Sequence, residues 1–136
     1  MNGVLVDTGP LVAILSIHDS AHAICLEQSR TISRPMLTCW PVVTEAVWLL
    51  RNRPVAVRAL FAAFRDDTLR IAPLDKADIP TIERILETYA SLRPQLADAA
   101  LVHLADREGV HTIFTLDRRD FSVYRLSRNR PLRLIP

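Results

Sequence analysis

The sequence predicts a doubly wound α/β fold, in which helices cover both faces of a parallel sheet. Short apolar segments of strand length alternate with longer helical segments along the chain. The strands are apolar throughout, as strands buried on both faces are, and no two-residue hairpin turn joins them. At 136 residues, with 49% hydrophobic and 24% charged residues, the chain is long enough to form this sheet as a single domain spanning 1–136.

The predicted strands are short apolar runs bounded by turn residues or proline. The first ends at Asp7-Thr8-Gly9-Pro10, a strand-to-helix turn, since Asp or Thr can cap a helix and proline suits its first turn. In chain order the predicted strands are 4–6, 36–39, 69–72, 111–115 and 132–135.

The helices are predicted from apolar spacing and from proline and glycine at their ends. Pro41 opens the third helix, Pro54 precedes the fourth, and Gly109 suits a left-handed cap after the last. The predicted helices are 10–16, 20–30, 41–50, 55–65, 75–91 and 95–108. Core-facing positions expected in the fifth are Ile79, Ile82, Ile85, Leu86 and Tyr89.

Composition excludes several classes of protein. No apolar run approaches the ~20 residues of a membrane helix, and Asp7 interrupts the N-terminal apolar stretch before a signal-peptide core forms. We therefore expect a soluble cytoplasmic protein with no membrane partner. Cys25 and Cys39 are too far apart for a Cys-x-x-Cys motif and are predicted to be buried hydrophobes.

Positive charge is concentrated near the C-terminus, although the net charge of the chain is only +2. Between Arg118 and Arg133 there are six arginines and one acid, Asp120. This segment is either a solvated basic surface or a region that attracts phosphate groups or an acidic protein.

Four carboxylates stand out because each lies among apolar residues, where an unpaired charge is costly. Two follow the first and fourth predicted strands, and two lie in early turns of helices that would start from the same sheet edge. If those two strands are neighbours, all four side chains converge at the edge where parallel sheets bind ligands. They are Asp7, Glu45, Asp98 and Asp117.

Each acid also has a simpler explanation when considered alone. Asp7 could be only a helix cap, and Asp117 could be a turn residue. Glu45 and Asp98 could gain ~0.3–1 kcal/mol from a helix N-terminus, which is small against the cost of burying a charge. The coincidence of all four at one edge favours a shared site.

A divalent cation would make such a cluster tolerable, because four carboxylates repel one another and Lys76 is the only lysine. Arginines could pair some of them, but all-oxygen ligation favours Mg²⁺, with Mn²⁺ as a substitute. Such a site suits phosphodiester hydrolysis, with two ions ~3.5–4 Å apart. The hydroxyls of Thr8 and Thr115 are placed to orient carboxylates or waters. The irregularly spaced His18, His22, His103 and His111 are expected to be surface or packing residues.

Other sites of this fold class are excluded by the sequence. With only Gly3, Gly9 and Gly109, neither a Gly-x-Gly-x-x-Gly motif nor a phosphate-binding loop can form. A receiver domain needs paired acids after the first strand and a lysine after the fifth, and an aspartyl phosphatase needs Asp where Gly9 stands.

These motifs together resemble those of PIN-domain ribonucleases, specifically the VapC-type toxins of toxin–antitoxin pairs. Four blocks follow the family's order and spacing, with Asp120-Phe121 after the last and His22-Ala23 after the first. The blocks are Val6-Asp7-Thr8-Gly9-Pro10-Leu11-Val12-Ala13, Thr44-Glu45-Ala46, Leu96-Ala97-Asp98-Ala99-Ala100 and Thr115-Leu116-Asp117.

The resemblance implies a three-layer α/β/α fold with five strands and a metal-dependent endoribonuclease that cuts structured RNA, such as tRNA, to inhibit translation. It implies that Asp7 and Asp98 are direct metal ligands, that Glu45 and Asp117 complete the site, and that Asp120 is less clearly catalytic. It also implies a homodimer and a VapB-type antitoxin. The alternatives are an inactive PIN-like module that binds RNA or protein, and a PIN nuclease acting in RNA processing or on DNA.

Four aromatic residues between the first and third acid blocks have two interpretations. Trp40, Trp48, Phe61 and Phe64 could form a partner groove, but core packing is the expectation that we favour.

Overall fold

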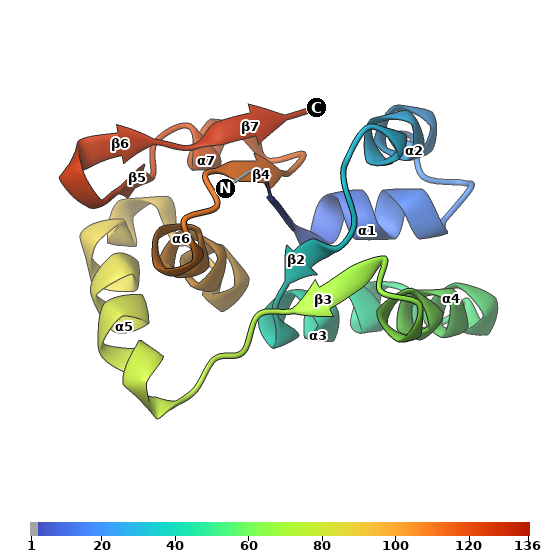
Figure 1. The fold of residues 1–136 in the computed structure, drawn as a ribbon, viewed down its shortest axis with the longest axis horizontal. Coiled ribbons are helices and arrows are strands. Elements are labelled where there is room, and N and C mark those ends of the chain that lie inside the picture. Colours follow the sequence, from blue (N-terminus) through green and yellow to red (C-terminus); the bar gives the residue numbers. More distant parts are fainter. Residues whose placement is uncertain (1–2) are drawn as a thin grey trace.

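A five-stranded parallel sheet forms the centre of the protein, as the sequence predicts (Figure 1). The structure is a computed structural model that describes residues 3–136. The order across the sheet is β3-β2-β1-β4-β7, and every neighbouring pair is parallel. The strands are β1 (Val4–Val6), β2 (Met36–Thr38), β3 (Leu69–Ile71), β4 (Thr112–Phe114) and β7 (Arg133–Ile135).

Helices cover both faces of this sheet and give the predicted three-layer fold (Figure 1). Helix α1 packs against α2, α3 and α4, while α5 packs against α6, and α3 also contacts α6. The helices are α1 (Thr8–Leu15), α2 (His22–Arg30), α3 (Trp40–Leu49), α4 (Pro54–Arg65), α5 (Ile79–Thr88), α6 (Leu96–Glu108) and α7 (Arg118–Phe121). In the part of the chain that the structure describes, no helix has the length and apolar character to cross a bilayer.

The core surrounds the two central strands. Leu5 of β1 and Ile113 of β4 are fully buried, and α6 contributes Ala97, Ala100 and Ala105 to the same core. Cys25 and Cys39 are buried with free thiols, as expected for small hydrophobes. Gly109 ends α6 with a φ of 65°, in the left-handed conformation that its sequence position predicts.

The prediction of one continuous helix over 75–91 is wrong. It divides into η1 (Lys76–Asp78), α5 and η2 (Ala90–Leu92), because Asp75 and Asp78 form a capping box that ends the first turn. Ile79, expected in the core, is 58% exposed, since it begins α5 at the point where the chain changes direction.

Helix α7 and an antiparallel pair, β5 (Arg125–Leu126) and β6 (Arg130–Pro131), were not predicted. The pair is only two residues long, too short for a periodic pattern. Its connecting segment, η3 (Ser127–Asn129), is held by Asp106 of α6, which accepts hydrogen bonds from the backbone N–H and hydroxyl of Ser127 at 2.9 and 2.7 Å.

Two histidines form hydrogen bonds that link elements of the fold. His103 Nε2 lies 2.7 Å from Asp78 Oδ1, which also accepts a hydrogen bond from Arg107 at 3.0 Å. Together with a backbone N–H, these contacts lower the pKa of Asp78 to about 2. The ring of His22 hydrogen-bonds the carbonyl of Ala13 at 2.7 Å and so links α2 to α1.

Candidate active site

The central strands β1 and β4 are direct neighbours, which is the condition on which the predicted convergence of the acids depends. Val6 lies opposite Phe114, and the backbone N–H of Asp7 donates to the carbonyl of Phe114 at 2.9 Å. Asp7 and Thr115 therefore leave the sheet side by side at its carboxyl edge.

A chain of hydrogen bonds links the two acids at this edge. The hydroxyl of Thr115, fully buried, donates to Asp7 Oδ2 at 2.8 Å and accepts from the backbone N–H of Asp117 at 3.0 Å. Asp7, only 8% exposed, accepts a second hydrogen bond from the N–H of Thr8 at 2.8 Å. Thr115 thus fixes the orientation of the Asp7 carboxylate and the position of Asp117.

The other two acids come from helices that begin at the same edge. Glu45 lies in the second turn of α3, and Asp98 is the third residue of α6. Asp98 Oδ2 accepts a hydrogen bond from the backbone N–H of Gln95 at 2.9 Å, so the start of α6 holds this carboxylate in place.

All four predicted acids line one cavity of about 450 Å³, which we name the acid cavity. Asp120, Arg93 and Gln95 also line it, and Thr8 forms part of its wall. The acid cavity is lined by the five carboxylates Asp7, Glu45, Asp98, Asp117 and Asp120.

Local helix capping occurs alongside this convergence. Asp7 is the N-cap of α1, and Asp117 is the N-cap of α7, where it accepts a hydrogen bond from the N–H of Asp120 at 3.1 Å. The simpler explanations for these two acids are therefore correct as local structure. They do not explain why the two caps share a cavity with Glu45 and Asp98.

Burial and mutual repulsion raise the pKa values of three acids. Burial is the main cause for Asp98, and with the charges of Asp7, Asp117 and Asp120 it raises the pKa to about 6. Burial raises the pKa of Asp7 against the effect of its two hydrogen bonds. The pKa of Glu45 is raised by burial and then by the Asp98 charge. Bringing these carboxylates together therefore costs free energy when they are ionised.

The donor chemistry of the acid cavity fits a hydrated divalent cation. The Thr8 hydroxyl is buried in the cavity wall without a hydrogen-bond partner, and the Tyr124 hydroxyl is also buried and unpaired. Buried polar atoms normally have a partner, so the Thr8 hydroxyl favours a polar occupant of the cavity. Within residues 3–136, no three His, Cys, Asp or Glu side chains stand close enough to share an ion. Each of Asp7, Asp98 and Asp117 is instead turned toward its own N–H donor.

The surroundings of Glu45 differ from the sequence interpretation. The apolar residues around it were expected to be buried, but Trp48 and Leu49, three and four positions after it, are exposed, whereas Val42 is buried. The expected core packing of the tryptophans is wrong, since Trp40 and Trp48 are 57% and 62% exposed.

Sequence reasoning missed two residues of the acid cavity. Gln95, the first residue of the predicted helix 95–108, is the N-cap of α6, and no sequence pattern distinguishes Arg93. The position of Pro94, which separates η2 from α6, was the only sequence feature pointing to a turn there.

The PIN-domain family model matches residues 4–126. The chain belongs to the PIN-domain family. This PIN domain is 34% identical over 125 residues to Ribonuclease VapC26 of Mycobacterium tuberculosis, covering 90% of this chain and 92% of that protein, and it is therefore of the VapC type. Its fold is similar to the crystal structure of Mycobacterium tuberculosis VapC20, a sarcin-ricin loop cleaving toxin. The TM-score is 0.75 at 20% identity, over 86% of this chain and 92% of that one.

The raised pKa of Asp98 predicts a pH dependence of stability in the metal-free protein. The pKa is about 6 in the folded protein and near 3.8, the ordinary value for aspartate, in the unfolded chain, so the folded state binds more protons between these pH values. The free energy of unfolding contributed by Asp98 therefore falls as pH rises from about 4 to 6. Urea unfolding in EDTA across this range should show Asp98→Asn losing less stability than the native protein. If the free energies of unfolding of the two proteins changed equally with pH, the raised pKa of Asp98 would be contradicted.

Proposed function

We propose that this PIN domain is a Mg²⁺-dependent endoribonuclease, the toxin of a toxin–antitoxin pair, acting as one domain (residues 1–136) in the cytoplasm. Its substrate is structured RNA such as tRNA, and its cleavage inhibits translation. The observation that carries this proposal is the single cavity lined by Asp7, Glu45, Asp98 and Asp117. The name of the relative at 34% identity, a ribonuclease, supports the substrate class.

The side chains of the acid cavity have separate roles in the proposed reaction. Asp7 and Asp98 would hold a hydrated cation, and Glu45 and Asp117 would complete the oxygen set through its bound waters. Thr115, which donates to Asp7 Oδ2 at 2.8 Å, keeps that carboxylate oriented. A divalent cation held here supplies positive charge that stabilises the developing phosphate charge and eases deprotonation of the attacking water. Mn²⁺ can replace Mg²⁺ because the ligands are oxygens.

The first prediction of this proposal concerns Asp98→Asn. Removing a metal ligand should lower RNA cleavage by about a hundredfold or more, beyond the loss usual for residues that only support a ligand. Millimolar Mg²⁺ should raise the melting temperature of the native protein, because the ion binds the folded state, and Asp98→Asn should lose most of this increase.

The matched control is Glu83→Gln, an exposed acid on α5 outside the acid cavity. It should keep both cleavage and the Mg²⁺-induced increase. Undiminished cleavage by Asp98→Asn would refute the catalytic assignment. A native protein that binds RNA without cutting it would favour an inactive binding module.

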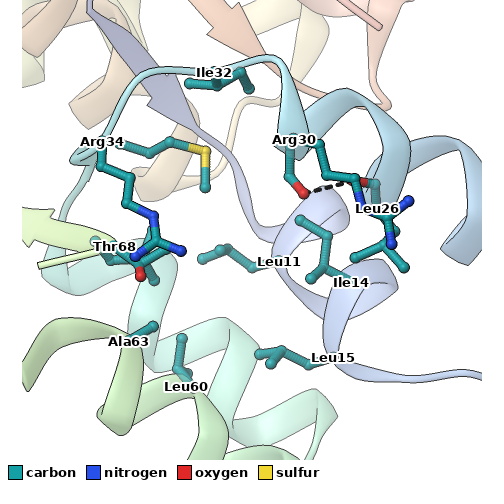
Figure 2. A pocket seen from close by; sticks show the side chains of 13 residues that line it. Leu11, Ile14, Leu15, Leu26, Arg30, Ile32, Arg34, Leu60, Ala63 and Thr68 are labelled. Atoms are coloured by element: carbon teal, nitrogen blue, oxygen red, sulfur yellow. Dashed lines mark hydrogen bonds between the residues drawn. The ribbon is translucent and has the colours of Figure 1, made fainter. Parts of the chain in front are cut away.

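An apolar cavity formed mainly by three helices, away from the acids, suits a protein partner, and we assign it to a VapB-type antitoxin. It has a volume of about 470 Å³ and lies between α1, α2 and α4 (Figure 2). Leucine and isoleucine side chains form its walls, and Arg30 and Arg34 flank it. This arrangement is complementary to an apolar helix with acidic residues beside its apolar face. The apolar walls are formed mainly by Leu11, Ile14, Leu15, Leu26, Ile32 and Leu60.

The antitoxin assignment predicts a selective effect of Leu26→Lys. A charge in the apolar cavity should weaken binding of the co-expressed VapB-type antitoxin by about tenfold or more, measured by calorimetry, while RNA cleavage persists. Ile24→Lys is the control, because Ile24 is 61% exposed on the same helix and does not line the cavity. Equal affinities for the two variants would rule out this docking surface.

The exposed tryptophans of α3 support a homodimer. Trp40, Trp48 and Leu96 line a shallow apolar cleft that also includes Glu45 and Gln95, two residues of the acid cavity. Exposed apolar patches of this kind mark interaction surfaces, and a two-fold contact would pair the patch with itself. We propose that a second copy of the chain covers it and brings two acid cavities together.

Trp48→Glu should therefore convert the protein to a monomer, because it places like charges across a two-fold axis. Light scattering after gel filtration measures the mass directly. Val55→Glu, which alters an exposed apolar residue of α4 away from this cleft, should remain dimeric. A native protein that is monomeric at high micromolar concentration would contradict the dimer.

A further inference from the structure

Arg93 is a cation at the border of the acid cavity. It lies between η2 and α6 and lines the cavity together with Asp98 and Asp117. Its side chain is exposed, so it can reach a ligand that approaches from solvent. Among the ion pairs found within residues 3–136, none includes Arg93.

The Arg93 guanidinium is not paired with the acids of the cavity. Within residues 3–136, the hydrogen bonds that Asp7, Asp98 and Asp117 accept come from backbone N–H groups and the Thr115 hydroxyl, and none comes from Arg93. If Arg93 served mainly to neutralise the carboxylates, its guanidinium would form an ion pair with one of them.

The backbone holds Arg93 in this place. Its φ and ψ are 51° and 54°, in the left-handed region that disfavours side chains other than glycine. Its N–H donates to the carbonyl of Ala90 at 3.0 Å, and Pro94 follows it. Glycine would adopt this conformation more easily, so arginine at this position is not explained by the turn alone.

An RNA strand entering the acid cavity meets repulsion between its phosphates and five carboxylates. A cation at the border offers an attachment point, and a guanidinium can form two parallel hydrogen bonds with a phosphate. We propose that Arg93 binds the RNA phosphate next to the cleaved linkage and so positions the strand over the acids. This inference rests on the proposed ribonuclease function and adds a substrate-binding residue to it.

The test measures RNA binding separately from cleavage. In an Asp98→Asn background, a labelled synthetic RNA oligonucleotide of mixed sequence is titrated with protein at several salt concentrations. Arg93→Ala should weaken binding by about tenfold, the effect of losing one charge-assisted contact. It should also reduce the slope of log affinity against log salt by about one, because one phosphate contact is lost. Arg93→Lys should restore the slope but only part of the affinity, since lysine keeps the charge without the fork.

Arg93→Gly separates binding from folding. Glycine relieves the left-handed backbone, so this variant should melt at or above the temperature of its parent while binding RNA as weakly as Arg93→Ala. Arg70→Ala, an exposed arginine on β3 outside the acid cavity, is the control and should bind as its parent does.

The inference is overturned if Arg93→Ala matches the parent in affinity and salt slope, or if the parent binds no RNA. It is also overturned if Arg93→Gly lowers the metal-free melting temperature and extra Mg²⁺ restores its RNA binding, since Arg93 would then only neutralise acids. Cleavage by the native protein is measured separately. If the native protein binds RNA through Arg93 but does not cut it, the proposed function fails while this inference stands.

Discussion

The parallel register between β1 and β4 is the constraint on which the acid cavity depends. With Val6 opposite Phe114, Asp7 and Thr115 leave the sheet together, and the Thr115 hydroxyl contacts both the Asp7 carboxylate and the backbone of Asp117. A shift of one residue would turn Thr115 to the other face of the sheet. The buried Asp7 carboxylate would then lose a hydrogen bond that offsets part of its burial.

The fold and the grouping of the acids were predictable because buried parallel strands leave a strong pattern. Strands covered on both faces are apolar throughout, so a carboxylate directly after one of them is conspicuous, as Asp7 is. Helix ends are equally clear where proline or glycine marks them, as Gly109 does. The pairing of β1 with β4 had to be assumed, since strand order depends on contacts between segments more than a hundred residues apart.

The features that the sequence did not reveal depend on tertiary contacts. Helix α3 is apolar on every side, so its spacing could not distinguish the buried Val42 from the exposed Trp48. The short antiparallel pair exists because Asp106 holds Ser127, a contact between residues 21 positions apart. Arg93 carries no pattern of its own, and only the convergence of other segments places it at the acid cavity.

The two tryptophans of this chain, Trp40 and Trp48, have a spectroscopic consequence. Both are exposed on the cleft beside Glu45, and the sequence contains no other indole. The guanidinium of Arg51 stacks over the ring of Trp48 at 3.9 Å, whereas no cation among residues 3–136 stacks on Trp40. Intrinsic fluorescence therefore reports on this single surface, and its emission wavelength is a natural gauge of whether water or another molecule covers it.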